Sequence, residues 1–310
     1  MNSSRRLGID IGGTKCMAVA IDAHGAVIDQ QRRPTPQHPD ELIETVIELA
    51  QSMKPWDSIG VGMPGLVDRS GVIRAAPNLV EIKNLRVGEL LGKEFGCFVY
   101  VDSDATCAGA AEWKVGAARG VDDVVMVTLG TGIGGGVIAG GVLIRGANGF
   151  TGEIGHMVVD PDGRPCLCGR RGCWERYASG AGLAWLAQGA HDGKGVARAI
   201  DLAGGKPGDV RGEHVTGAAR EGDADALAVV DDYGRWVALG LVNLTNILDP
   251  AMFVLGGGLA VGADVFLAPI RHWFGELLYA PDLRPHPALV FAQLGERAGA
   301  IGAAMLADLH

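Results

Sequence analysis

Basic charge is scarce in this sequence: 27 lysines and arginines stand against 36 aspartates and glutamates, which gives a net charge of −9. The one basic cluster is a group of four arginines around a cysteine-rich loop, namely Arg164, Arg170, Arg171 and Arg176. Nucleic acids and anionic membranes are bound largely through positive charge. We therefore expect neither of them as a partner.

Targeting and repeat patterns are also missing. The N-terminal residues lack a charged segment followed by an apolar segment and a small-residue cleavage site, so we expect a cytoplasmic protein. We find no short tandem repeat and no low-complexity linker. With 310 residues, 48% of them hydrophobic and 20% charged, the composition is typical of a globular protein with one large domain or two.

One uncharged run has the length of a membrane span. Residues 124–144 contain no charge over 21 positions, but seven of these residues are glycine. The glycines interrupt two β-branched segments, so the pattern predicts a strand, a turn and a second strand inside a globular core.

The remaining hydrophobic patterns alternate between strand and helix and so favour an α/β architecture. A helix is expected to begin near Pro39, because Asp40 and Glu41 would occupy its first turn and complement its dipole. Further helical patterns cover residues 105–115, most of 177–248, and 296–309. Strands are expected at 6–11, 17–21, 26–31, 58–61, 97–101 and 252–255.

A first glycine turn follows the first strand in the run Asp10-Ile-Gly12-Gly13-Thr14-Lys15. Adjacent glycines let backbone N–H groups approach an anion without hindrance from Cβ atoms. Thr14 adds a hydroxyl and Lys15 a positive charge, and Asp10 could hold Mg²⁺ through water. The alternative is an ordinary hairpin turn, in which Gly-Gly pairs are common.

A second glycine turn, Gly130-Thr131-Gly132-Ile133-Gly134, also connects two expected strands. It lacks the lysine of a P-loop, and it does not open a helix as a dinucleotide-binding turn does. Gly257 lies in a third glycine run, directly after another strand. Together the three runs indicate two phosphate-binding turns and one close approach for a purine.

Three cysteines and a histidine lie within eighteen residues: His156, Cys166, Cys168 and Cys173. This Cys3His spacing suits tetrahedral zinc. Glu153 and Glu175 flank the set, which favours a polar site beside the metal. The alternative is a structural zinc loop far from any chemistry. The other cysteines, at 16, 97 and 107, are interpreted as small core residues.

Taken in order, these motifs resemble the ROK family (repressors, open reading frames and sugar kinases). The resemblance rests on Asp-x-Gly-Gly-Thr-Lys, Gly-Thr-Gly-Ile-Gly, Gly-Glu-Ile-Gly-His and Cys-x-Cys-Gly-x2-Gly-Cys-x-Glu, and it extends from residue 6 to the end of the chain. Within the family the sequence is most similar to bacterial zinc-containing glucokinases.

The resemblance implies an α/β, actin-like (ribonuclease H-like) ATPase fold, with two domains around a central cleft. The small domain would comprise residues 1–120 with the C-terminal helix 296–310 packed back on it. The large domain would comprise residues 121–295 and carry the zinc loop 156–173. The expected cofactors are ATP, catalytic Mg²⁺ and structural Zn²⁺, and the expected assembly is a homodimer or homotetramer.

The resemblance also implies roles for individual residues. Asp104 would be the catalytic base. ATP would contact the residues of the glycine turns: Asp10, Gly12, Gly13, Thr14, Lys15, Gly130, Thr131, Gly132 and Gly257. The sugar would contact Gly65, Asn78, Ser103, Asp104, Glu153, His156 and Glu175. Zinc would be held by His156, Cys166, Cys168 and Cys173.

Simpler roles compete for three of these positions. Asp104 could cap its helix, with Asp102 as the competing base. Asn78 follows Pro77 and could be a turn residue, and Glu175 could pair with Arg171 or Arg176. The family usually has Asn-Asp-Ala-Asn around the base, whereas Ser103 and Thr106 occupy the two asparagine positions here. A shorter Ser103 puts one sugar contact in doubt.

The function expected from this resemblance is phosphorylation of glucose to glucose 6-phosphate at the expense of ATP and Mg²⁺. Alternatives within the same chemistry are N-acetylmannosamine, N-acetylglucosamine or fructose as acceptor, and polyphosphate as donor. A sugar-responsive repressor is the alternative from another class. The acidic charge and the five residues before the first strand argue against it.

Overall fold

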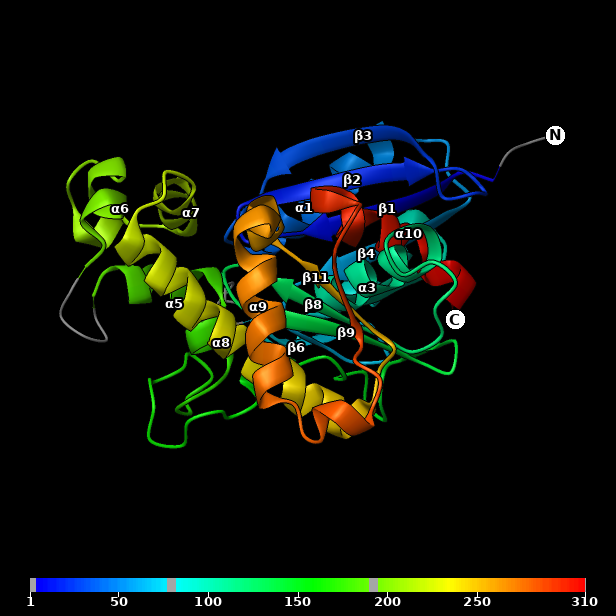
Figure 1. The fold of residues 1–310 in the computed structure, drawn as a ribbon. Helices are drawn as coiled ribbons and strands as arrows, with labels where there is room; N and C mark the ends of the chain where they lie inside the picture. The colour runs from blue at the N-terminus through cyan, green and yellow to red at the C-terminus, as the bar shows by residue number, and fades with distance from the viewer. Residues whose placement is uncertain (1–3, 77–81, 190–194, 310) are drawn as a thin grey trace. The chain divides into compact units, whose positions relative to one another are not determined.

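The computed structural model describes residues 4–76, 82–189 and 195–309 (Figure 1). Its first sheet has the strand order β3-β2-β1-β4-β7. Strand β1 pairs antiparallel with β2 and parallel with β4, β2 pairs antiparallel with β3, and β4 pairs parallel with β7. The strands are β1 (Arg6–Ile11), β2 (Lys15–Ile21), β3 (Val27–Pro34), β4 (Ser58–Met63) and β7 (Val99–Ser103).

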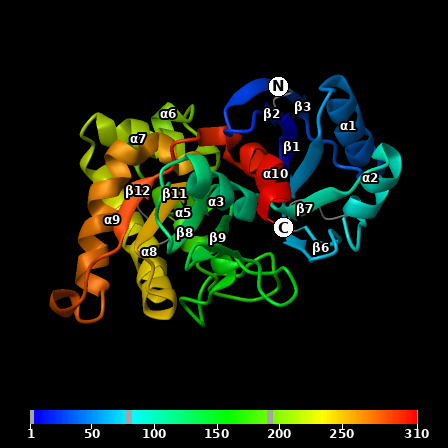
Figure 2. The same cartoon turned by 90° about the vertical axis from the view of Figure 1, so that its right-hand side faces the viewer.

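Alternation along β2 separates the two faces of this sheet. Cys16, Ala18 and Ala20 belong to one hydrophobic cluster, and Met17, Val19 and Ile21 belong to another. The first cluster includes residues of α1 (Pro39–Ser52) and α2 (Val87–Phe95), and the second includes residues of α3 (Asp104–Val115) and α10 (Ala298–Leu309). Figure 2 shows α10 and α1 on opposite sides of β1. The sheet is therefore covered on both faces.

A second sheet has the order β10-β9-β8-β11-β12. Strand β9 pairs antiparallel with β10, and β11 pairs parallel with β12. A small antiparallel pair is formed by β5 (Leu66–Val67) and β6 (Ile73–Ala75). The strands of the second sheet are β8 (Val124–Leu129), β9 (Ile133–Ala139), β10 (Val142–Ile144), β11 (Met252–Gly256) and β12 (Ala288–Phe291).

The helices after the cysteine loop are built around α8 and α9, which pack against each other. Helix α8 begins at an aspartate cap, since Asp223 accepts a hydrogen bond from the N–H of Ala226. The helices are α4 (Glu175–Ala178), α5 (Gly180–Ala187), α6 (Ala197–Leu202), α7 (Gly212–Arg220), α8 (Ala224–Leu248) and α9 (Ala263–Leu277). Short 3₁₀ segments are η1 (Ile154–His156), η2 (Pro207–Asp209), η3 (Gly258–Gly262), η4 (Pro281–Leu283) and η5 (Gly295–Arg297).

The chain divides into two compact units. The first comprises Met1–Met126, Gly135–Gly152 and Ala292–His310, and the second comprises Val127–Gly134 and Glu153–Phe291. In the first unit, α10 packs against α3, β1 and β4. No helix in the described part of the chain combines the length and the apolar character that crossing a membrane requires.

Most expected elements are present, with shifted ends. The strand expected at 97–101 runs from Val99 to Ser103, because its partner β4 pairs with those residues and Phe98 faces solvent with 73% of its surface exposed. The following helix begins at Asp104 rather than at Ala105. The hydrophobic patterns did not predict α2, α9, β5, β6, β10 or β12. The four strands among these have at most four residues each, so their alternation is too short to be recognised in the sequence.

Candidate active site and metal centre

In the first unit, Asp104 occupies the first position of α3, immediately after β7. Its Oδ1 accepts a hydrogen bond of 2.7 Å from the backbone N–H of Ala105. The cap of this helix is Ser103, whose hydroxyl accepts from the N–H of Thr106 at 3.2 Å. The structure therefore assigns the capping role, which the sequence left open for Asp104, to its neighbour Ser103. The Ser103 hydroxyl also lies 3.2 Å from the Thr106 hydroxyl, so a sugar would have to share it.

Asp102 is poorly suited to be the base. Its side chain is 1% exposed, and its Oδ2 lies 2.6 Å from Nε of Arg145. Its Oδ1 accepts a hydrogen bond from the N–H of Ser103 at 2.8 Å. A base has to reach the proton that it removes. Asp104, which is partly exposed, meets this condition better than the buried Asp102.

A second carboxylate, that of Asp10, is buried beside Asp104. Burial, followed by the negative charge of Asp104, raises the pKa of Asp10 to about 8, while the positive charge of Lys15 opposes the rise. Oδ1 of Asp10 is buried and has no hydrogen-bond partner among the residues that the structure describes. A Cβ atom on Gly299 would stand 2.5 Å from the carboxyl carbon of Asp10, so only glycine fits there. The site thus holds an acid whose ionised form needs a cation.

The first glycine turn connects β1 and β2, as its sequence predicted. The N–H of Gly12 donates to the carbonyl of Lys15 at 2.9 Å, and the Thr35 hydroxyl donates to the carbonyl of Gly12 at 2.7 Å. The Nζ of Lys15 forms an ion pair with Glu296, which also pairs with Arg32. The turn is therefore anchored to neighbouring strands, and Glu296 neutralises its lysine.

Two of the expected sugar contacts lie after β4. Gly65 has a φ of +101°, which favours glycine, and a Cβ there would stand 2.2 Å from the carbonyl oxygen of Ala75. The backbone geometry by itself therefore requires a glycine at position 65. Asn78 lies outside the described residues.

In the second unit, the second glycine turn and Gly257 lie together. The N–H of Gly130 donates to the carbonyl of Gly132 at 3.0 Å, while Thr131 at the tip of the turn is exposed. Gly257 has a φ of +82°, and a Cβ there would stand 2.6 Å from the carbonyl of Leu129, the last residue of β8. The second glycine turn and the glycine run after β11 are thus close neighbours.

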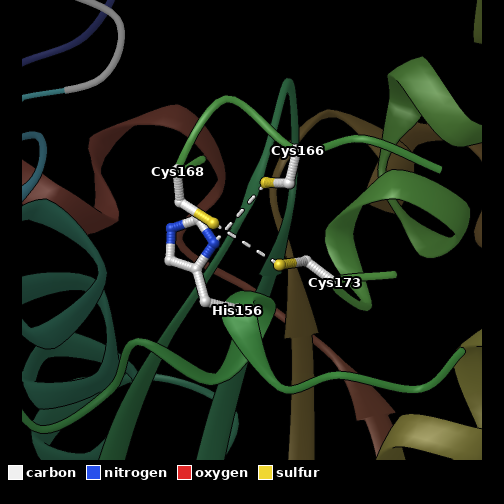
Figure 3. Close-up of side chains that lie close together, drawn as sticks. All are labelled: His156, Cys166, Cys168 and Cys173. Atoms are coloured by element: carbon white, nitrogen blue, oxygen red, sulfur yellow. Dashed lines mark hydrogen bonds between the residues drawn. The ribbon is translucent and has the colours of Figure 1, made fainter. Parts of the chain in front are cut away.

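The structure brings the four residues of the Cys3His pattern together (Figure 3). His156 comes from the 3₁₀ segment η1, and the cysteines come from the loop before α4. Nδ1 of His156 is 3.8 Å from Sγ of Cys166, and the Sγ atoms of Cys168 and Cys173 are 3.6 Å apart. The four ligand atoms all lie within 4.8 Å of one another.

These distances fit a tetrahedral zinc site. Two thiolates that each lie about 2.3 Å from zinc at a tetrahedral angle are about 3.8 Å apart. The donor set of three sulfur atoms and one imidazole nitrogen is also one that zinc prefers. The residues present therefore suit the metal that their spacing predicted.

Two glutamates flank this cluster. Oε2 of Glu153 lies 3.8 Å from Nε2 of His156, and Oε1 of Glu175 lies 3.8 Å from Nδ1 of the same ring. Burial raises the pKa of Glu153, the neighbouring His156 opposes this, and Glu175 adds to it. Oε2 of Glu175 also accepts from the N–H of Ile133 at 3.4 Å. Glu175 thus faces both the metal loop and the second glycine turn, not the arginines considered as its partners.

Two side chains of the first unit were not identified from the sequence. Glu296 neutralises the lysine of the first glycine turn, and Arg145 holds Asp102. No motif marks Glu296. Arg145 could have been noticed in the sequence, because it is the first charged residue after the uncharged run 124–144.

Comparisons with known proteins identify relatives of similar sequence. The model of the ROK family matches residues 6–309. A glucokinase from Streptomyces coelicolor is 36% identical over 97% of this chain and 96% of its own length. An N-acetylmannosamine kinase from Escherichia fergusonii is 31% identical over 97% of this chain and 98% of its own length.

A solved structure is similar over the same extent. The ROK family glucokinase from Streptomyces griseus, in complex with glucose and AMPPNP, superposes with a TM-score of 0.88 at 35% identity, covering 98% of this chain and 99% of that one. Two five-stranded sheets combined with helices, together with these matches, define an actin-like ATPase fold. This chain belongs to the ROK family.

Proposed function

We propose that this ATP-dependent sugar kinase transfers the terminal phosphoryl group of ATP to glucose and releases glucose 6-phosphate. The observation that carries the proposal is the position of Asp104, a partly exposed carboxylate where β7 meets the N-terminus of α3. Similarity to a glucokinase at 36% identity supports glucose as the acceptor.

Asp104 would act as the general base. A sugar hydroxyl is a weak nucleophile, and a carboxylate within hydrogen-bond reach takes its proton as the phosphoryl group is transferred. The dipole of α3 stabilises the ionised form of Asp104, since the positive end of a helix dipole lies at the N-terminus. Because Ser103 caps α3, the helix does not require Asp104 as its cap.

The two glycine turns would hold the phosphates of ATP, and Gly257 would lie beside the adenosine. Phosphoryl transfer depends mainly on positioning and on neutralising negative charge. Lys15 would supply positive charge after exchanging Glu296 for phosphate. Mg²⁺ would neutralise the phosphates, and the unpartnered Oδ1 of Asp10 suits a hydrogen bond to a water molecule of that ion.

The sugar would be recognised by Glu153, His156 and Glu175. Further contacts would come from Gly65, Asn78 and Ser103. Carboxylates accept strong hydrogen bonds from sugar hydroxyls. Structural zinc on the Nδ1 side of His156 would fix the ring and leave Nε2 for the sugar, because a metal-bound imidazole has one defined tautomer. We further propose that the enzyme assembles as a homodimer or homotetramer.

A panel of acceptors and donors tests this function. The values of kcat/KM are measured for glucose, fructose, N-acetylglucosamine and N-acetylmannosamine, each with ATP and with polyphosphate. We expect glucose with ATP to give the largest value. A larger value for an N-acetylated sugar would replace glucose as the substrate, and phosphorylation of no sugar would refute the kinase.

The second candidate is a kinase for another hexose. It is favoured by Ser103, whose hydroxyl is already shared with Thr106 and its backbone N–H. A site with one weaker hydroxyl contact discriminates less strongly between sugars that differ there. Similar kcat/KM values for glucose and one of its epimers would support this candidate.

A further inference from the structure

The end of strand β7 is held by an arginine from another part of the chain. In the described residues, β7 is the last strand of its sheet and pairs only with β4. A terminal N–H of Arg145, which follows β10, donates to the carbonyl of Val101 at 3.4 Å. Nε of the same guanidinium lies 2.6 Å from Oδ2 of Asp102. Arg145 therefore contacts two consecutive residues, two and three positions before Asp104.

This ion pair is buried on both sides. The Asp102 side chain is 1% exposed and that of Arg145 is 11% exposed. Burial raises the pKa of the Asp102 carboxyl, and the charge of Arg145 opposes that rise. Removing two charges from water costs as much free energy as their attraction returns, so a buried pair is a poor device for stability alone. Its defined geometry accounts better for this arrangement.

Arg145 is itself fixed in place. The guanidinium of Arg69 donates twice to the carbonyl of Gly146, at 2.9 and 2.6 Å, and the N–H of Arg69 donates to the carbonyl of Asn148 at 3.1 Å. These contacts hold the segment that carries Arg145 on both sides of Ala147. A side chain anchored on such a segment presents its guanidinium to β7 with little freedom.

We propose that Arg145 and Asp102 are positioning residues that fix the end of β7 and thereby the carboxylate of Asp104; this inference rests on the proposed role of Asp104. The contacts form a continuous series. Arg145 holds Asp102, Asp102 accepts from the N–H of Ser103 at 2.8 Å, and Ser103 caps α3, whose first residue is Asp104. Displacement of a reacting group by about 1 Å costs up to about a hundredfold in rate.

The test compares one double variant with wild type. Asp102→Asn together with Arg145→Met removes both charges and leaves neither ion buried alone, so its unfolding midpoint should stay near that of wild type. We expect kcat to fall by about tenfold to a hundredfold. The KM values for sugar and ATP, and sugar affinity by calorimetry, should change much less. A folded double variant with a kcat within about twofold of wild type would overturn the inference.

A conservative variant keeps the inference testable if the double variant does not fold. In Arg145→Lys, a single ammonium group replaces the broad guanidinium and cannot contact both the Val101 carbonyl and Asp102 with the same geometry. We expect a folded protein with kcat lowered by about threefold or more and KM values little changed. An unchanged kcat in this variant would also overturn the inference.

The control makes the same exchanges at an exposed pair of the second unit. Arg220 lies 2.7 Å from Asp264, and the two side chains are 47% and 58% exposed. Arg220→Met with Asp264→Asn should leave kcat unchanged. Turnover by wild type and its loss in Asp104→Ala are measured first in the same assay. If wild type phosphorylates no sugar, the proposed function is wrong, and if Asp104→Ala keeps its turnover, the proposed role of Asp104 as the base is wrong. A failure limited to the Asp102 and Arg145 variants refutes only the positioning role.

Discussion

The indole ring of Trp174 lies directly against the backbone of Gly240 in α8. A Cβ atom at Gly240 would stand 2.0 Å from Cε2 of the ring, and the indole N–H donates to the carbonyl of Trp236 at 2.8 Å. Trp174 is completely buried. It lies in sequence between the metal-cluster residue Cys173 and Glu175. Helix α8 therefore sets the position of the last part of the candidate site in the second unit.

Substituting Gly240→Ala should destabilise the protein and weaken sugar binding. The added methyl group overlaps the ring, and overpacking of this kind costs about 1–3 kcal/mol in the free energy of unfolding. Movement of Trp174 would displace Cys173 and Glu175, so affinity for sugar should fall more than affinity for ATP. Urea denaturation and calorimetry measure the two effects.

Gly275→Ala in α9 is the matched control. Apart from the backbone of its own helix, a Cβ atom at this glycine would meet no heavy atom of the described residues within 4 Å. Alanine is the better helix former by about 1 kcal/mol, so this variant should be as stable as wild type or more stable. If both variants behaved alike, the contact between Trp174 and Gly240 would have no role in seating the loop.

Loss of the metal should weaken sugar binding far more than ATP binding. Cys168 is the most suitable ligand to remove, because its exposed side chain contributes little packing. In Cys168→Ala the ring of His156 loses its fixed orientation, and groups that orient a site in this way contribute about tenfold to a hundredfold in affinity. We expect the dissociation constant for sugar to rise by that factor while that for ATP stays nearly constant.

Metal content and the two affinities are measured on the same preparations. Cys97 lies outside the cluster and is exposed, so its interpretation as a core residue was wrong, unlike that of the buried Cys16 and Cys107. Cys97→Ala is therefore the control and should retain metal and both affinities. Unchanged binding of both substrates by metal-free Cys168→Ala protein would show that the cluster is a purely structural site with no effect on the sugar site.

The sequence predicted those parts of the site that depend on local motifs. The Cys3His cluster and the hairpin at Gly12 follow from spacing within short segments, because neighbouring residues determine both. The position of Asp104 after a strand also followed from local pattern, although that strand is two residues further along than expected. The choice between Asp102 and Asp104 as the base required the structure, since the burial of each side chain depends on what packs against β7.

Contacts between segments that are distant along the chain could not be predicted from the sequence. Arg145 and Asp102 are 43 positions apart, and Lys15 and Glu296 are 281 positions apart. Gly240 appears in the sequence as an unfavourable residue inside a helix, and only the ring of Trp174 explains it. Contacts between such distant residues are determined by the tertiary fold, and local spacing in the sequence does not reveal them.

Asp104→Ala should nearly abolish turnover and leave glucose binding measurable. General base catalysis contributes about 10²- to 10⁴-fold, so kcat should fall by at least about a hundredfold. The backbone is little affected, because Ser103 rather than Asp104 caps α3. Rapid-quench kinetics give the rate of phosphoryl transfer, and calorimetry gives the affinity for glucose. Near-normal turnover would show that another group removes the proton.

The stability of the ligand-free protein should depend on the pH through Asp10. Burial raises the pKa of this carboxyl from 3.8 to about 8, so the folded protein retains a proton that the unfolded chain loses near pH 4. The stabilising contribution is therefore fully present below about pH 4 and is lost as the pH rises to about 8. The slope is at most about 1.4 kcal/mol per pH unit.

Asp10→Asn isolates this effect, because a neutral amide of similar shape replaces the protonated acid. Urea denaturation of both proteins in the presence of a chelator, between pH 5 and pH 8, gives the difference in their free energies of unfolding. That difference should shift steadily in favour of the Asn variant as the pH rises, since only wild type must ionise a buried group. A difference that stayed constant over this range would show that Asp10 is already ionised in the folded protein, and the buried carboxylate would then need a compensating cation even without ATP.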